Sequence, residues 1–390
     1  MIRLLPLAAP LHPAALTGEL VERVAARLGQ TCEVVDHGPA EVLLVVTGGV
    51  EQEAAALLEP DRVVLLLAHS QHNSLAAALE IAAHARQVGG SSRILLLERD
   101  GLDRLEHLAP ILGAHRQLRG SRLGCIGSPS DWLVASAPSP ALVARTWQIE
   151  VVRLPMADLL DALATAAPEE VAPVLSRFER VVEPSADDVA GALGVYVALR
   201  GLVRSYRLDA LTLRCFDLLS RRTTGCLALS RLNDEGIVAG CEGDLGAALA
   251  MMWARALTGQ PCFMANPQDV DIQANTVDIA HCTIPMTMIR SAVLRSHFES
   301  SSGVGIEGEM EAGPVTLLRI GGPDLDEVFV SDGVLVEVER SPARCRTQLR
   351  VRLKEEVDTL LEHPLGNHLV MLQGHWAGTF DESHRLLFPR

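Results

Sequence analysis

The sequence contains few aromatic residues, and this scarcity limits both its packing and its choice of ligands. Phenylalanine, tyrosine and tryptophan make up 3% of the 390 residues, whereas hydrophobic residues as a whole make up 48%. We therefore expect an aliphatic core, built chiefly from leucine, valine and alanine. Few platforms remain on which a sugar ring could stack, and the cleft candidates among the tryptophans are Trp132, Trp253 and Trp376.

The sequence also lacks an excess of basic residues. Its formal net charge at pH 7 is −15, from 34 lysines and arginines against 49 aspartates and glutamates. Nucleic-acid binding depends on clustered lysine and arginine, so we expect no nucleic-acid partner. No apolar run reaches the roughly 20 residues that cross a bilayer. We accordingly expect a soluble, cytoplasmic protein with no membrane partner.

Two common cofactor signatures are missing. No G-x-G-x-x-G follows the apolar segments of the N-terminal part, so a dinucleotide cofactor is not expected there. No C-x-x-C pair or zinc-finger spacing occurs among the eight cysteines, which argues against a structural metal cluster and for free, buried thiols. The cysteines are Cys32, Cys125, Cys215, Cys226, Cys241, Cys262, Cys282 and Cys345.

The length and the patterning indicate several domains, since 390 residues exceed one ordinary core. Residues 1–150 alternate helical segments with short apolar runs such as 41–46 and 62–68, as buried parallel strands do. Residues 151–285 repeat this alternation, and residues 286–390 consist of short segments of alternating polarity between glycine and proline turns. The predicted fold is α/β: two doubly wound, Rossmann-like α/β domains followed by a C-terminal antiparallel β domain.

The most informative stretch begins at Gly240-Cys241-Glu242-Gly243-Asp244. Glycine permits backbone conformations that other residues resist, so a carboxylate in this turn is well placed to point into a cleft. Glu242 is therefore the first catalytic candidate. Asp244 stands at the N-cap of a helix predicted over 245–258, where it is either only a cap or also part of the site.

Further polar groups follow this helix. A short strand predicted over 261–265 places Asn266 at its carboxyl end, and Asp269, Asp271 and Asp278 come next. His281 lies beside apolar residues, a setting typical of a core histidine as well as of a metal ligand.

Other candidates lie where strands are predicted to end. His72 and Asn73 follow an apolar strand, so they form either a wall for a polyhydroxylated ligand or a solvated turn. Arg214 is placed either in the cleft or in a surface ion pair. Polar residues beside apolar strands give three more cleft candidates, Glu299, Glu307 and Arg346. A local anion site for a phosphorylated or sulfonated sugar could be formed by Arg214, Arg295, Arg344 and Arg346.

Several segments, in order along most of the chain, resemble the L-fucose isomerase and L-arabinose isomerase superfamily, and most closely its compact fucose-isomerase-related proteins. The segments are Gly225–Ser230 (GCLALS), Leu232–Gly236 (LNDEG), Cys241–Asp244 (CEGD), His281–Pro285 (HCTIP), Arg295–Ser300 (RSHFES), Cys345–Gln348 (CRTQ), Gly366–His368 (GNH) and, more weakly, Gly127–Trp132 (GSPSDW).

The resemblance implies an aldose–ketose isomerase that uses a divalent metal, usually Mn²⁺, and that assembles as a trimer or hexamer with subunits completing each other's clefts. Glu242 matches the metal-binding, catalytic glutamate of the family. His368 matches the metal-binding histidine near the C-terminus, and His281 matches a metal histidine of the arabinose branch. The loop that contains Trp132 corresponds to one that contributes to the substrate region or to the subunit contact.

The sequence departs from the family at Asn266, where the fucose branch has a metal-binding aspartate. An asparagine can offer a carbonyl oxygen to a cation but cannot take up a proton at neutral pH. Three outcomes are open: Asp271 or Asp269 supplies the missing carboxylate, Glu242 shuttles the proton alone, or the site keeps the metal but has lost or changed the reaction.

The predicted activity is therefore metal-dependent isomerisation of a sugar, or of a phosphorylated, sulfonated or deoxy sugar, with Glu242 as base. The alternative is a catalytically silent or repurposed relative that binds metal and sugar.

Overall fold

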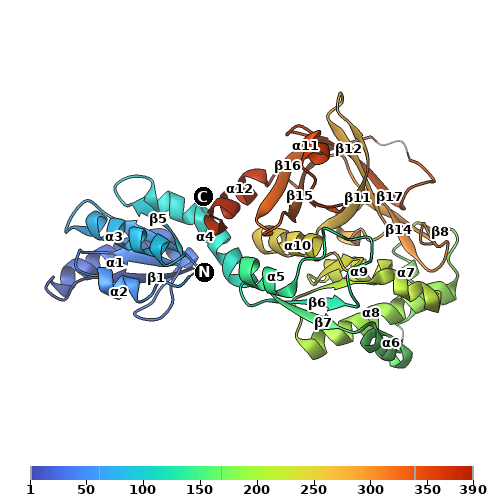
Figure 1. The fold of residues 1–390 in the computed structure, drawn as a ribbon, viewed down its shortest axis with the longest axis horizontal. Coiled ribbons are helices and arrows are strands. Elements are labelled where there is room, and N and C mark those ends of the chain that lie inside the picture. The colour runs from blue at the N-terminus through green and yellow to red at the C-terminus, as the bar shows by residue number, and fades with distance from the viewer. Residues whose placement is uncertain (1, 61, 168, 338–339, 389–390) are drawn as a thin grey trace. The chain divides into compact units, whose positions relative to one another are not determined.

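The computed structural model describes residues 2–60, 62–167, 169–337 and 340–388. The chain forms two compact units (Figure 1). The first unit comprises the residues up to Arg116 together with those from Thr379 onward, and the second comprises Gln117–Gly378.

The first unit is built on a parallel sheet with the strand order β2-β1-β3-β4-β5. Its strands are β1 (Ile2–Leu7), β2 (Cys32–Val34), β3 (Val42–Val45), β4 (Val63–Ala68) and β5 (Ser91–Leu96). Its helices are α1 (Ala14–Leu28), η1 (Gly29–Thr31), α2 (Glu51–Ala55), α3 (Ser74–Gln87), α4 (Gly101–Leu118), whose end falls in the second unit, and most of α12 (Ala377–Leu387). The central strands β3 and β4 are almost wholly buried, which explains their uninterrupted leucine and valine runs.

The C-terminal helix α12 is attached to this unit by a buried carboxylate. Glu382 on α12 accepts hydrogen bonds from Arg93 and Arg104, and its Oε2 lies 2.7 Å from Nε2 of His107. The Glu382 side chain is only 7% exposed, so these partners replace the water that a carboxylate would otherwise require.

The second unit begins with another parallel sheet, ordered β10-β9-β6-β7. Its strands are β6 (Arg122–Ile126), β7 (Glu150–Leu154), β9 (Ala210–Leu213) and β10 (Val238–Cys241). The accompanying helices are α5 (Pro140–Trp147), α6 (Met156–Thr165), α7 (Val171–Leu175), α8 (Ala186–Tyr206), η2 (Cys215–Arg221), α9 (Cys226–Asp234) and α10 (Leu245–Thr258).

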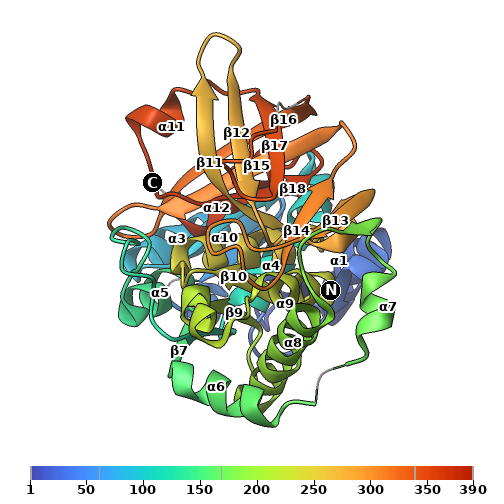
Figure 2. The ribbon, with the colours of Figure 1, turned by 90° about the vertical axis from the view of Figure 1, so that its right-hand side faces the viewer.

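An antiparallel barrel completes the second unit, closed in the order β11-β12-β17-β16-β15-β18 (Figure 2). The barrel strands are β11 (Phe263–Asp271), β12 (Thr276–His281), β15 (Pro314–Gly321), β16 (Glu327–Val336), β17 (Thr347–Leu353) and β18 (Leu369–Gln373). A smaller sheet, ordered β14-β13-β8, contains β8 (Arg180–Val181), β13 (Ser291–Arg295) and β14 (Gly305–Glu309). The remaining short helices are η3 (Met286–Met288) and α11 (Thr359–Glu362).

Helix α10 lies between the parallel sheet and the barrel, as both views show. It contacts β9 and β10 on one side and β15 and β18 on the other. Every residue from Leu245 to Ala254 is buried, because the helix is covered on both sides. The N-terminus of α10 therefore opens at the junction of the two sheets, and the turn that contains Glu242 precedes it.

The predicted mixture of parallel α/β sheets and antiparallel structure is confirmed, but two details differ. The strand predicted over 261–265 runs from Phe263 to Asp271, so Asn266 lies inside β11 rather than at its end. Both β11 and β12 belong to the barrel, although they precede the expected boundary at residue 285. No described helix has the length and apolar character that a membrane crossing requires.

We predict that Glu382→Gln loosens α12 from the first unit. The substitution removes the charge that Arg104 and His107 contact, which costs about 1–3 kcal/mol for a buried hydrogen-bonded group. Hydrogen–deuterium exchange of α12 and α4 should become faster than in the unaltered chain.

Asp381→Asn is the matched control, because Asp381 is the neighbouring residue on α12 but is exposed. Its exchange should be unchanged. Equal exchange in the two variants would contradict the role assigned to Glu382.

Candidate metal centre

Glu242 occupies a constrained turn between β10 and α10. Its φ is +60°, and the next residue, Gly243, has a φ of +74°. A Cβ at Gly243 would lie 2.7 Å from Cα of Pro129, so only glycine fits there. Glu242 itself accepts a left-handed conformation that non-glycine residues seldom adopt, a feature common at functional sites.

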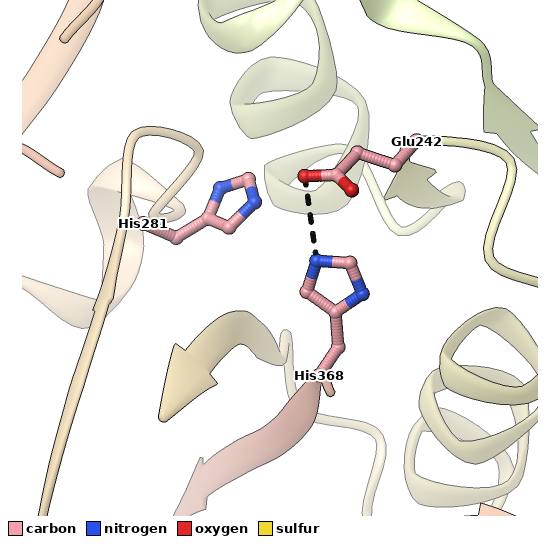
Figure 3. A group of neighbouring side chains, drawn as sticks. All are labelled: Glu242, His281 and His368. Atoms are coloured by element: carbon pink, nitrogen blue, oxygen red, sulfur yellow. Dashed lines mark ion pairs between the residues drawn. The ribbon is translucent and has the colours of Figure 1, made fainter. Parts of the chain in front are cut away.

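Three side chains from separate segments meet at this turn (Figure 3). Glu242 follows β10, His281 ends β12, and His368 immediately precedes β18. One potential ligand atom from each lies within 4.8 Å of those of the other two, and all three residues are buried. The structure thus brings together three of the four predicted metal ligands.

His368 is oriented by Asp244. Nδ1 of the ring donates a hydrogen bond to Oδ2 of Asp244 at 2.9 Å, and Asp244 also accepts from the amide of Ala247 as the N-cap of α10. Asp244 is therefore more than a helix cap. Nε2 of His368 points toward Glu242 and lies 3.5 Å from its Oε1, and it forms no hydrogen bond within the described part of the chain.

Asp244 is in turn paired with a buried arginine. Nη1 of Arg319, on β15, lies 3.1 and 3.0 Å from the two carboxylate oxygens of Asp244. Nη2 of Arg319 donates to the hydroxyl of Ser136 at 2.6 Å. Asp244 is fully buried and Arg319 is 1% exposed, so the pair holds the orienting carboxylate in its ionised form.

The charges of this group shift the pKa of each member. Burial alone would lower the pKa of His368, but Asp244 and Glu242 outweigh it and raise this pKa to about 9. Burial raises the pKa of Glu242, yet the contacts with His368 and Trp132 leave it below its usual value. For His281, burial and then the charge of His368 lower the pKa to about 4.

His281 completes the group from the barrel side. Its Nδ1 forms a hydrogen bond with the hydroxyl of Thr283 at 3.1 Å, which leaves Nε2 for another partner. The ring centroids of His281 and His368 are 5.8 Å apart.

These donors fit a divalent cation. A metal-bound histidine usually donates its second ring nitrogen to a carboxylate, as His368 does to Asp244. A bound cation would take the place of the proton on the buried Nε2 of His368, an atom that forms no hydrogen bond with the described residues. One carboxylate with two imidazoles suits a divalent first-row transition metal.

A cavity that is partly open to solvent lies beside this group. Its polar lining includes Glu242, Asn266, His281, His297 and Glu299. His297 was not singled out from the sequence, because a histidine after a strand resembles many surface residues. The rest of the lining is Cys215, Phe216, Leu219, Thr224, Gly225, Cys226, Cys241, Cys282 and Cys345.

Trp132 contacts the catalytic candidate directly. Its Nε1 donates a hydrogen bond to Oε2 of Glu242 at 2.6 Å, although the residue as a whole is 52% exposed. The ring of Trp132 meets Phe216 edge-on at 5.0 Å, and Phe216 meets His297 at 5.7 Å. Trp132 thus connects Glu242 to Phe216 and His297, two residues of the cavity lining.

The structure does not bring Asp271 to the group. Asp271 is exposed in the β11–β12 hairpin, where it accepts a hydrogen bond from the amide of Ala274 at 2.9 Å. Its partner across the ladder is Thr276, which is five residues (281 − 276) from His281, or about 17 Å along a strand. Asn266 does line the cavity, and its Oδ1 accepts from Asn367 at 3.1 Å.

The two arginine candidates differ in their partners. Arg214 pairs with Asp131 and Asp217, which counters its charge. Arg346 donates instead to the carbonyl and hydroxyl oxygens of Ser296, at 2.8 and 3.0 Å.

His72 and Asn73 lie in the first unit between β4 and α3, both with positive φ. Asn73 stands at the N-cap of α3, but its side chain makes no capping hydrogen bond there.

Comparison with known proteins finds no family model that matches the chain. The chain is 26% identical over 275 residues to sulfoquinovose isomerase from Alkalicoccus urumqiensis, which covers 67% of this chain and 61% of that protein. A sulfoquinovose isomerase from Clostridium sp. (strain MSTE9) is 30% identical over 122 residues, 31% of this chain and 26% of its own.

A third relative, sulfoquinovose isomerase from Priestia megaterium, is 27% identical over 195 residues, which cover 47% of this chain and 44% of that protein. The alignments thus span less than two thirds of each of these relatives. The similarities confirm the predicted resemblance of the chain to the L-fucose isomerase and L-arabinose isomerase superfamily.

Proposed function

We propose that the chain is a metal-dependent aldose–ketose isomerase that acts on a sulfonated sugar. The observation that carries this proposal is the buried group of Glu242, His281 and His368, of which Glu242 and His281 line a cavity. The names of the similar proteins supply the substrate class, because each is a sulfoquinovose isomerase. Sulfoquinovose is therefore the first sugar to test.

Isomerisation moves a proton between two adjacent carbon atoms by way of an enediolate. A divalent cation, for which we propose Mn²⁺, would be held by Glu242, His281 and His368 and would offset the negative charge of the enediolate oxygens. Asn266, also on the cavity wall, could offer its carbonyl oxygen as a further ligand.

Glu242 is the proposed base. Its contacts with His368 and Trp132 keep its pKa below the usual value despite burial, so it is ionised and able to accept a proton at neutral pH. The hydrogen bond from Trp132 fixes Oε2, which leaves the carboxylate in one orientation toward the cavity. In the forward direction it takes the proton from carbon 2 of the aldose and returns it to carbon 1.

A single base on one face of the sugar is the version that the site supports best. Asn266 cannot exchange a proton, and Asp271 lies in the exposed hairpin. Among the described residues that line the cavity, the carboxylates are Glu242 and Glu299. Glu299 and His297 are then available to hold sugar hydroxyl groups or to relay the proton between the two oxygens.

Arg346 is the proposed contact for the sulfonate. Its guanidinium donates to uncharged oxygen atoms of Ser296, whereas that of Arg214 is paired with carboxylates. An arginine fork can donate two parallel hydrogen bonds to two oxygens of an anionic group. His72, Asn73 and Trp132 remain proposed substrate contacts, and a trimer or hexamer remains the proposed assembly.

We predict that Glu242→Gln abolishes proton exchange. The amide keeps the shape of the side chain but cannot accept the proton, and losing a positioned base costs about 10²–10⁴-fold in rate. Purified protein with Mn²⁺ and sulfoquinovose in deuterated water should incorporate deuterium at carbon 1 or 2, as measured by NMR, and the variant should not.

Asp271→Asn is the comparison that separates the two base assignments. If Glu242 is the single base, the Asp271→Asn variant should exchange deuterium at the rate of the unaltered chain. A loss of exchange equal to that of Glu242→Gln would make Asp271 the second base. The alternative is a catalytically silent, sugar-binding relative. It holds if no deuterium is incorporated into sulfoquinovose or into any aldose of a broader panel, while one of these sugars binds tightly.

We predict that His368→Gln removes the bound cation. The variant loses Nε2 of His368, a buried ligand atom that forms no hydrogen bond with the described residues. Atomic emission after refeeding with Mn²⁺ should find the ion in the unaltered chain and not in the variant. His363→Gln, an exposed histidine at the end of α11, should retain it. An ion retained in His368→Gln would exclude this residue as a ligand.

We also predict that Asp244→Asn weakens Mn²⁺ binding by about 10–100-fold, because the orienting carboxylate of His368 is lost. Titration of the cation by calorimetry measures this effect, and circular dichroism checks that the variant is folded. Unchanged affinity in a folded variant would limit Asp244 to its role as helix cap and partner of Arg319.

A further inference from the structure

The cavity beside Glu242 is lined by five of the eight cysteines, all of them free thiols. They come from segments far apart in the sequence. None of their sulfur atoms belongs to the group of possible ligands formed by Glu242, His281 and His368. The proposed isomerisation does not require them. We therefore ask what these thiols could do.

Two of these thiols are in direct contact. Sγ of Cys215 lies 3.0 Å from Sγ of Cys241, with both residues buried. The contact follows from the sheet: Cys241 ends β10, Leu213 is its partner in the neighbouring parallel strand β9, and Cys215 comes two residues later as η2 begins. The backbone therefore holds the two sulfur atoms together without help from a flexible loop.

Both residues of the pair belong to the cavity wall. Cys215 and Cys241 line the cavity, and they are 8% and 3% exposed. The cavity is thus the route by which a small oxidant would reach these two residues. Cys215 is the more exposed of the two residues, so we expect the oxidant to react with it first.

We propose that Cys215 and Cys241 are a dithiol modification site that a small hydroperoxide converts to a disulfide. The Cys215 sulfur attacks the peroxide, whose O–O bond breaks, giving a sulfenic acid at Cys215 and one molecule of water or alcohol. The Cys241 sulfur then attacks this sulfur, the S–O bond breaks, and a second water leaves as the S–S bond forms. Two thiols lose two electrons and two protons, the peroxide takes them up, and a dithiol reductant reverses the change.

A disulfide at Cys241 would affect the neighbouring residue Glu242. Cys241 is joined directly to Glu242, whose φ of +60° and neighbouring Gly243 leave the turn little freedom to adjust. A disulfide bond is about 2.05 Å long, so the sulfur atoms must approach each other by about 1 Å. A displacement of that size next to a catalytic group is enough to lower a rate by an order of magnitude or more.

The other cavity thiols form a different arrangement. Cys282 interacts with both Cys226 and Cys345, so neither neighbour is its exclusive partner. Cys215 and Cys241 are the pair whose sulfur contact is adjacent to the Glu242 turn.

Peptide mapping tests the proposal without relying on turnover. Folded protein is treated with hydrogen peroxide, blocked with an alkylating agent, denatured and digested with trypsin. Cys215 then lies on the peptide Cys215–Arg221 and Cys241 on Leu232–Arg255, while Cys226 lies separately on Thr223–Arg231. We expect mass spectrometry to find the first two peptides linked, and the link to disappear after dithiothreitol.

Two variants make the result specific. The link should be absent from Cys215→Ser and retained in Cys262→Ser, which removes a buried cysteine that does not line the cavity. Links that join Cys282 to Cys226 or Cys345 without one between Cys215 and Cys241 would overturn the proposal. Oxygen adducts on single cysteines with no link would do the same.

An activity measurement adds the consequence and rests on the proposed function. Deuterium exchange into sulfoquinovose should fall by at least about tenfold on peroxide treatment and recover on reduction, in step with the linked peptide. If the disulfide forms while deuterium exchange stays constant, the coupling of the disulfide to Glu242 is overturned. If the protein shows no deuterium exchange before treatment, the proposed function is overturned. The disulfide is then still tested by mass spectrometry.

Discussion

The ion pair between Arg319 and Asp244 is the interaction on which the candidate site depends. Arg319 belongs to the barrel strand β15, and Asp244 caps α10, which follows the parallel sheet. Two buried charges are costly to withdraw from water unless each is paired and its remaining hydrogen-bonding groups are satisfied. Here Ser136, the amide of Ala247 and the ring of His368 provide those partners. The barrel can therefore pack on α10 in the arrangement that also presents His368 to Glu242.

The cavity contains two kinds of chemistry side by side. Carboxylate and imidazole groups converge at one end, where their oxygen and nitrogen atoms suit a divalent cation. Thiols cover much of the remaining wall, outside the group that could hold the ion. The segment Cys241–Asp244 connects these parts, because it contains a thiol of the contacting pair, the proposed base and the carboxylate that orients His368. A change at the sulfur atoms is thus transmitted through one short, constrained turn.

The comparison of sequence and structure is instructive at particular residues. Local patterns were sufficient for α10, for the capping role of Asp244, and for the glycine that the turn at Glu242 requires. They were insufficient for β11, whose extent is set by pairing with β12 and β18 rather than by its own residues. Asp271 looked close to the site because it is near Asn266 in the chain, but a β-strand carries each further residue about 3.3 Å away. Likewise Trp132 was expected near the substrate, and its hydrogen bond to Glu242 emerges only from the folded chain.

The sequence by itself determined the alternation of helices and strands, the residue types able to bind a cation, and the likeness to sugar isomerases, because these are properties of short segments and their order. Tertiary structure alone decided which of those residues meet. His281 and His368 are 87 residues apart (368 − 281), and closure of the barrel places both against Glu242. It also decided that Cys215 touches Cys241, since the lateral neighbour of a strand in a parallel sheet is fixed by packing and crossover connections, not by the local sequence.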